Sequence, residues 1–220
     1  MFAATPERDA MLRARVQADL ASSRPSSTRP DPTPADRRAA FLALPEPVGQ
    51  PAYEMQADGS IIQKMAPKPR HSAVQEEILF RFRAARARRI AQAYPELRIA
   101  WPNAIPTSVP DIVVYRWARR PIGADGQLAD EASLPPDLAI EIVSPGQSPA
   151  SVGAQCAGYL ERGTGLALLV DPERRTVHLY TPDDPLVPRS LGPDDRLDLG
   201  DLLPDPPSVA ELFAALTPEP

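Results

Sequence analysis

Apolar positions along residues 51–66 predict a β-hairpin at the start of a folded domain. Two short runs, AYEM and SIIQK, lie on either side of Asp58-Gly59, a dipeptide that favours a tight turn. In the next segment, 71–94, apolar residues recur every three or four positions, as they do on the buried face of an amphipathic helix. Pro95 follows this segment, so we expect the helix to end there.

Longer apolar runs predict the centre of a sheet. PDIVVYRW (110–117) has the composition of a strand, and PDLAIEIVS (136–144) is almost continuously apolar, as a strand covered on both faces would be. Strands outnumber helices in this pattern, which predicts an α/β or α+β domain with a mixed β-sheet flanked by helices. The other predicted elements are strands over 97–101, 166–170 and 176–182 and helices over 149–162 and 208–216 (the latter capped by Ser208). Segment 118–135 is predicted to be a loop, and segment 183–207 to be mostly turns with short strand pieces.

The residues before this domain have a different pattern. Segment 7–22 is compatible with a short amphipathic helix, and Asp36 is predicted to cap a helical turn over 36–44. Segment 23–36 is rich in Ser, Pro and Thr, so it buries too little apolar surface to offset its ordering entropy, and we interpret it as a flexible linker. The predicted organisation is a largely flexible extension over 1–50, a folded domain over 51–216 and a tail over 217–220.

Composition excludes several classes of protein. The net charge is −5, which argues against a strongly basic protein that coats DNA but leaves room for a local basic surface. One cysteine, Cys156, excludes an internal disulfide and a cysteine-based zinc site, and two histidines exclude a histidine-rich one. No apolar run approaches the length of a membrane span, no secretory signal is visible, and no nucleotide-binding fingerprint occurs. We therefore expect a cytoplasmic protein without a nucleotide cofactor.

Two carboxylates stand out against the apolar strands. Glu141 lies in the middle of LAIEIV, where a charge is costly unless it is paired or binds a metal. Asp111 opens the apolar run DIVVY after Pro110. Two carboxylates on neighbouring strands can share Mg²⁺, which prefers oxygen ligands. The alternatives are a buried salt bridge from Glu141 to an arginine and an ordinary strand-start role for Asp111.

Several motifs in this order resemble the PD-(D/E)XK nuclease superfamily and, more closely, a large bacterial family of predicted restriction endonucleases. The resemblance covers residues 51–215. It implies a restriction-endonuclease-like fold, cleavage of DNA phosphodiesters that depends on Mg²⁺ or Mn²⁺, and Asp111 and Glu141 as metal ligands. The motifs that carry it are DGSIIQKMAPKPRH (58–71), PDIVVY (110–115), PPDLAIEIVSPGQS (135–148), AGYLERGT (157–164), LVDPERRTVHLY (169–180) and LDLGDLLPDPPSVAELF (197–213).

The sequence departs from the superfamily at the catalytic lysine. The superfamily places a lysine two residues after the glutamate, where this chain has Val143. The bacterial family carries it instead four residues before the tyrosine that aligns with Tyr159, and that position is Gln155. The chain has two lysines, of which Lys64 on the predicted hairpin is the one that could reach the site. Without such a cation, the resemblance predicts an impaired endonuclease.

Other residues have supporting roles in this interpretation. The resemblance places His71 near the metal or the phosphate, although a locally bonded helix-start histidine is the alternative. Arg81 and Arg88, on the basic helix, are predicted to contact DNA phosphates, although a solvated surface is equally compatible with them. DNA is the expected partner, and a homodimer is compatible with the sequence. The rival hypothesis is an inactive protein on the same scaffold that binds DNA or another protein.

Overall fold

The computed structural model describes residues 32–44, 52–56, 58–64, 66–102, 106–129 and 131–217. The chain divides into two compact units, Met1–Pro45 and Glu46–Pro220. In the first unit, helix α2 (Pro34–Leu42) begins inside the segment predicted to be a linker. Its N-cap is Thr33, and the prediction that Asp36 caps it is wrong, because Asp36 is the third helical residue and closes a capping box with Thr33. The helix predicted over 7–22 lies outside the described residues.

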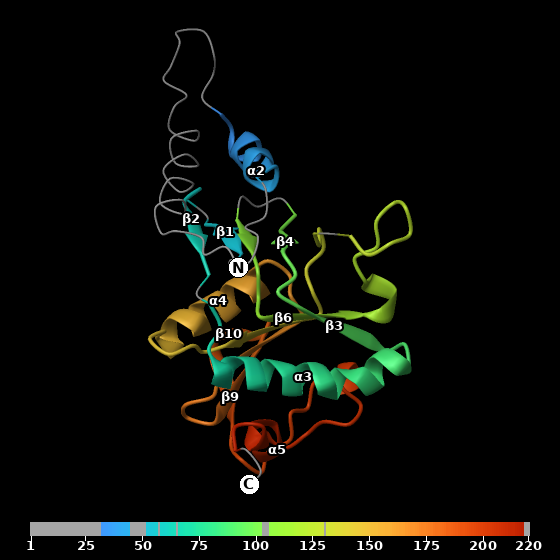
Figure 1. Ribbon diagram of the computed structural model, residues 1–220, viewed down its shortest axis with the longest axis vertical. Helices are drawn as coiled ribbons and strands as arrows, with labels where there is room; N and C mark the ends of the chain where they lie inside the picture. The colour runs from blue at the N-terminus through green and yellow to red at the C-terminus, as the bar shows by residue number, and fades with distance from the viewer. Residues whose placement is uncertain are drawn as a thin grey trace, which may run out of the picture. The chain divides into compact units, whose positions relative to one another are not determined.

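The second unit carries the strands and the remaining helices (Figure 1). In chain order they are β1 (Tyr53–Met55), β2 (Ile61–Gln63), α3 (Pro69–Ala87), β3 (Ala91–Pro95), β4 (Ile99–Ala100), β5 (Thr107–Ser108), β6 (Ile112–Arg116), the 3-10 helix η1 (Trp117–Arg119), β7 (Leu138–Ile142), α4 (Pro149–Glu161), β8 (Leu166–Asp171), β9 (Thr176–Thr181), β10 (Asp184–Leu191), the 3-10 helix η2 (Gly200–Leu202) and α5 (Val209–Ala214).

A six-stranded mixed sheet forms the centre of this unit. The strand order is β10-β9-β8-β7-β6-β3, in which β7 and β8 are parallel and the other neighbours antiparallel. Strands β1 and β2 form a separate hairpin, and β4 pairs with β5. The predicted fold class, a mixed sheet flanked by helices, is confirmed.

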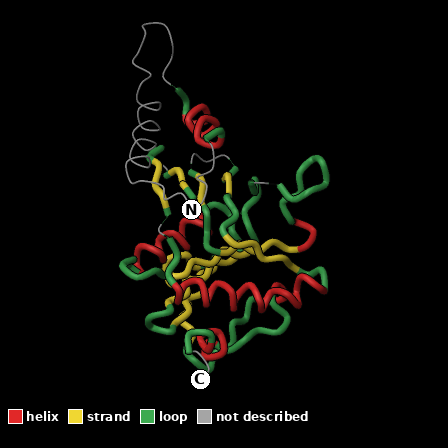
Figure 2. Tube along the Cα trace, viewed as in Figure 1, coloured by secondary structure: helices red, strands yellow, loops and turns green. Residues whose placement is uncertain are grey.

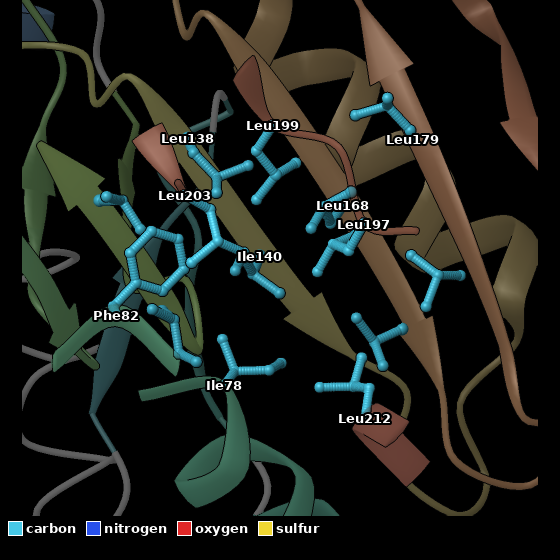
Figure 3. Packing of buried hydrophobic residues seen from close by; sticks show 14 of the residues in the cluster. Ile78, Phe82, Leu138, Ile140, Leu168, Leu179, Leu197, Leu199, Leu203 and Leu212 are labelled. Atoms are coloured by element: carbon cyan, nitrogen blue, oxygen red, sulfur yellow. The ribbon is translucent and has the colours of Figure 1, made fainter. Parts of the chain in front are cut away.

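Helices cover both faces of the large sheet (Figure 2). Alternate residues of β6, β7 and β8, such as Ile112, Ile140 and Leu168, pack against α3, α5 and the chain that precedes α5. Figure 3 shows this layer, in which Ile78 and Phe82 of α3 face the leucines and isoleucines of the strands. The intervening strand residues face α4, which packs through its own buried side chains. The strand with the predicted continuous apolar run, β7, is therefore buried on both faces, as expected.

The largest error of the sequence prediction concerns segment 71–94, which is not one helix. Helix α3 ends at Ala87, and Arg89 then takes a left-handed backbone conformation with φ 54°. Residues 91–95 form β3, which pairs with β6 along its full length. Tertiary pairing has overridden the helical pattern there, because the strand's hydrogen bonds come from a segment twenty residues away that local periodicity does not report.

Most other predicted elements are confirmed, with differences at the sheet margins. The hairpin, strands β6 to β9, helix α4 and the Ser208-capped helix α5 lie where the pattern predicts them. The strand predicted over 97–101 is reduced to Ile99–Ala100. Segment 183–207 contains an eight-residue edge strand, β10, where the sequence predicts only short strand pieces because two prolines break its pattern.

Candidate active site

Asp111 lies where the chain enters β6, opposite the end of β7. The register pairs Ile112 with Ile140, so the next pair along this antiparallel ladder is Asp111 and Glu141. Because side chains alternate along a strand, both carboxylates point to the face of the sheet that α4 covers. The sheet thus brings together the two acidic residues that the sequence predicts as metal ligands.

The Asp111 carboxylate is 4% exposed and has three polar partners. Its Oδ1 accepts a hydrogen bond from Lys64 Nζ at 2.7 Å, and its Oδ2 accepts one from the Ile142 backbone N–H at 2.7 Å and lies 3.0 Å from His71 Nε2. Burial alone would raise the pKa of Asp111, but the hydrogen bond from His71 and the charge of Lys64 outweigh it and hold the pKa well below its usual value. Asp111 is therefore an anion held in one orientation.

Glu141 experiences a different environment, although it lies opposite Asp111. It is 6% exposed, and the Tyr159 hydroxyl donates a 2.5 Å hydrogen bond to its Oε1. Burial, and then the negative charge of Asp111, raise the pKa of Glu141 to about 8, although Lys64 and Tyr159 act in the opposite direction. Among the described residues, Glu141 has no ion pair with an arginine, and its nearest cation is Lys64.

Lys64 reaches this site from the hairpin. It follows β2, and its Nζ donates hydrogen bonds to the Val109 carbonyl at 2.6 Å and to Asp111 at 2.7 Å. Burial would lower the pKa of Lys64, but the charges of Glu141 and Asp111 raise it above its usual value. The side chain is still 21% exposed. The hairpin therefore delivers a permanent cation to the two carboxylates.

A third buried carboxylate, that of Glu54, was missed by the sequence prediction. Glu54 lies on β1, is 6% exposed, and accepts a 2.6 Å hydrogen bond from the Val109 backbone N–H. Burial raises the pKa of Glu54, although Lys64 lowers it. No local pattern marks it, because a glutamate between Tyr53 and Met55 in a short hairpin strand is expected to face solvent. Glu54 and Lys64 together attach the hairpin to the segment that leads into Asp111.

These residues open into one cleft of about 570 Å³. Both predicted ligands, Lys64, His71 and Gln155 line it, and so do Glu54 and residues of the loop before α4. The lining residues are Ala52, Glu54, Ile62, Gln63, Lys64, Ala66, Pro67, His71, Glu96, Asp111, Glu141, Ile142, Ser144, Gly146, Gln147 and Gln155.

The remaining predicted site residues divide between the cleft and the surface. Gln155 is exposed on α4, one helical turn before Tyr159, and has no charged group to offer. The Tyr159 ring stacks on Trp101 with centroids 5.8 Å apart, which fixes the hydroxyl that bonds Glu141. Arg81 and Arg88 do not line the cleft; Arg81 pairs with Glu77 at 2.6 Å, and Arg88, the C-cap residue of α3, lies 3.9 Å from Asp205.

The sequence and the structure of this chain both resemble those of known proteins. A profile of the family Uma2, described as "Putative restriction endonuclease", matches residues 38–212. The chain belongs to the Uma2 family. One similar solved structure is that of a "putative nuclease belonging to DUF820" from Anabaena variabilis ATCC 29413, with 34% identity and a TM-score of 0.73 over 82% of this chain and 98% of that chain. Among curated proteins, none matches the chain.

Membership of Uma2 confirms the predicted family and supports a nuclease. Both predicted acidic residues, the hairpin lysine and His71 lie inside the matched range, which begins in α2 and ends in α5. Among the described residues, no helix has the length and apolar character that crossing a membrane requires.

Proposed function

We propose that this chain is a DNA endonuclease whose hydrolysis of phosphodiester bonds depends on Mg²⁺ or Mn²⁺ held by Asp111 and Glu141. We further propose that Lys64 supplies the positive charge that Gln155 lacks. The observation that carries this proposal is the position of the Lys64 ammonium, 2.7 Å from Asp111 in the cleft that Glu141 also lines. Family membership supports the nuclease class, and the description of the family supports DNA as the substrate.

The donor set fits a hard divalent cation. Among the described residues, no three His, Cys, Asp or Glu side chains gather as a complete ligand set. Mg²⁺ does not need one, because it usually binds one or two carboxylates and completes its shell with waters and substrate phosphates. Glu141 has one hydrogen-bond partner and a pKa raised to about 8, so a cation beside it would relieve an unfavourable environment. The chemistry that such a cation supplies is polarisation of a phosphoryl oxygen and acidification of water.

The protein's own groups hold the reacting centre in place. His71, the Ile142 N–H and Lys64 fix the Asp111 carboxylate, while Tyr159 fixes Glu141. A phosphate that enters the cleft would meet the Lys64 ammonium, which carries three donors. During hydrolysis water adds to phosphorus, the phosphorus–oxygen bond to the leaving strand breaks, and negative charge grows on the phosphoryl oxygens. One preorganised donor at such a position is worth about 10²–10³ in rate.

Nicking of supercoiled plasmid DNA tests the proposal. We expect nicking by the wild-type chain with Mg²⁺ or Mn²⁺, none with EDTA, and none from Asp111→Asn with either ion. Lys64→Met should lower the rate about 10²-fold or more. Lys68→Met is the matched control, because Lys68 is the chain's other lysine and is exposed before α3.

The outcomes separate the rival functions. If Asp111→Asn keeps the wild-type rate, the metal site is misplaced. If neither ion supports nicking but the protein binds the plasmid, the nuclease proposal is wrong and the chain is a binding module on this scaffold. Circular dichroism of each variant shows whether a lost rate reflects lost folding.

A further inference from the structure

Beside the cleft, the edge of the sheet that ends in β3 carries arginines that have no acidic partner among the described residues. Several other arginines pair with carboxylates, as Arg98 does with Glu131 and Arg174 does with Asp171. Among the described residues, none of the arginines at this edge has an ion pair within 4.0 Å. We call this surface the arginine edge. It consists of four arginines and two aromatic residues: Arg83, Arg86, Arg89, Arg120, Phe80 and Trp117.

The members of the arginine edge lie together although they come from two parts of the chain. Arg83 and Arg86 of α3 line a shallow groove of about 390 Å³ with Phe80, which is 57% exposed. Glu76 is the single carboxylate among the residues that line this groove. The Arg83 guanidinium carbon lies 5.9 Å from the centre of the Phe80 ring. This groove is therefore cationic and has an aromatic wall.

The second part of the arginine edge surrounds Trp117. Arg120 stacks on the Trp117 ring at 3.5 Å, and Arg89 lies 6.0 Å from the same ring. The Arg120 Nε–H donates a 3.0 Å hydrogen bond to the Trp117 carbonyl, which orients the stacked guanidinium, and its two terminal NH₂ groups remain to bind a phosphate. Arginines of both parts act on Tyr94 of β3: burial raises the pKa of Tyr94, although the charges of Arg120 and Arg86 act in the opposite direction. Its buried hydroxyl has no hydrogen-bond partner among the described residues.

Strand β3 connects the arginine edge to the cleft. It is an edge strand that pairs only with β6 in the large sheet. Glu96, immediately after β3, lines the cleft, whereas Ala93 lines the arginine groove. At about 3.3 Å per residue these two positions are about 10 Å apart, and the start of β3 beside Trp117 is about 17 Å from the cleft. B-DNA advances 3.4 Å per base pair, so these distances correspond to about three to five base pairs.

We propose that the arginine edge binds the phosphate backbone of the DNA about three to five nucleotides from the bond cut in the cleft. This inference rests on the proposed function for its substrate. The cleft alone attracts DNA poorly, because its lining has one lysine, Lys64, and four carboxylates. These carboxylates are those of Glu54, Glu96, Asp111 and Glu141. A chain with net charge −5 gives DNA no general attraction, so a local cationic surface must hold it.

The proposal differs from a general role for the basic helix. Arg81 and Arg88, the C-cap residue of α3, are seven residues apart and share one flank, while Arg83 and Arg86 occupy the other flank, towards β3. Arg81 is already paired with Glu77. The two flanks can therefore be tested against each other with variants that remove the same charge from the same helix.

The test measures binding of a fluorescent 24-base-pair duplex in EDTA, by anisotropy, over a range of salt concentrations. EDTA separates binding from cleavage. Arg83→Ala/Arg86→Ala should weaken binding and flatten the dependence of log Kobs on log salt by about 1.8, because each phosphate contact contributes about 0.9. Arg120→Ala should flatten it by about 0.9. The matched control, Arg81→Ala/Arg88→Ala, should leave the slope unchanged.

Each alternative outcome is distinct. An unchanged slope in Arg83→Ala/Arg86→Ala, or a loss confined to the Arg81→Ala/Arg88→Ala control, overturns the proposal, as would binding to phosphatidylserine vesicles in preference to DNA. A flattened slope in a protein that never nicks plasmid supports the arginine edge while the proposed nuclease function fails. Nicking with an unchanged slope leaves the nuclease function standing and refutes the arginine edge. Thermal unfolding of each variant confirms that the fold is intact.

Discussion

Replacing Glu141 by glutamine should stabilise the metal-free protein. The carboxylate is 6% exposed beside Asp111, and its pKa is raised to about 8 from the ordinary value of 4.5. Between these pH values the folded protein binds more protons than the unfolded chain. The free energy of unfolding contributed by Glu141 therefore falls as pH rises through this window and is fully present only below pH 4.5. Glutamine keeps the shape and an acceptor for Tyr159 but does not ionise.

The size of the stability difference follows from how far the pH lies above 4.5, the ordinary pKa of Glu141. Each pH unit corresponds to about 1.4 kcal/mol. At pH 7 the variant should thus be more stable than the wild type by about 3 kcal/mol, with the difference disappearing near pH 4.5. Urea unfolding followed by circular dichroism at several pH values, in EDTA, measures this difference. Glu76→Gln is the matched control, because Glu76 is exposed on α3, and it should change stability by less than about 0.5 kcal/mol at every pH.

Added Mg²⁺ should reverse the ranking. Mg²⁺ at a thousand times its dissociation constant for the folded wild type stabilises it by about 4.1 kcal/mol, which exceeds the variant's advantage of about 3 kcal/mol at pH 7, whereas the variant lacks one of the two ligands. A variant that is no more stable than the wild type at pH 7, or a difference that does not vary with pH, would refute the reasoning about Glu141. Equal stabilisation of both proteins by Mg²⁺ would show that Glu141 is not a ligand.

Three further predictions concern α4. Tyr159→Phe should weaken Mg²⁺ binding measured by calorimetry, because Glu141 loses its hydrogen-bond donor, and should lower stability by about 1–2 kcal/mol. Gly153→Ala should destabilise the protein by about 1–3 kcal/mol in urea unfolding, because the new Cβ would lie 2.5 Å from the buried Tyr180 hydroxyl. Gly158→Ala, where the new Cβ meets only the flexible end of an arginine, should be neutral or stabilising by up to about 1 kcal/mol, and an equal loss in both variants would contradict the packing argument.

The two central carboxylates could be predicted from the sequence because they interrupt apolar strands. Glu141 is conspicuous inside LAIEIV, and Asp111 opens the adjacent strand, so burial alone marks them. Strand β3 could not be predicted in the same way. Its residues continue a helical pattern, and only the hydrogen bonds to β6 make them a strand.

Local sequence patterns did not mark Glu54, and they left Lys64 as a candidate for the cation without showing how it reaches the site. Lys64 and Glu54 lie on a three-residue hairpin strand or directly after one, where charged residues usually face solvent. Their positions depend on how the hairpin docks on the segment before Asp111, through Val109 and Thr107. The family pattern places the lysine on α4, after Glu141 in the sequence. In the structure the cation is Lys64, which follows β2 and precedes Asp111 in the sequence.

The most direct test of this account is whether Gln155→Lys rescues Lys64→Met. Single-turnover rates of plasmid nicking in Mg²⁺ should fall about 10²-fold in Lys64→Met and recover at least about tenfold in Lys64→Met/Gln155→Lys, because both positions line the same cleft. Gln155→Lys alone should add little to the wild-type rate. If Gln155→Lys alone raises the rate about 10²-fold while Lys64→Met changes nothing, the catalytic cation belongs on α4, and the role assigned to Lys64 is wrong.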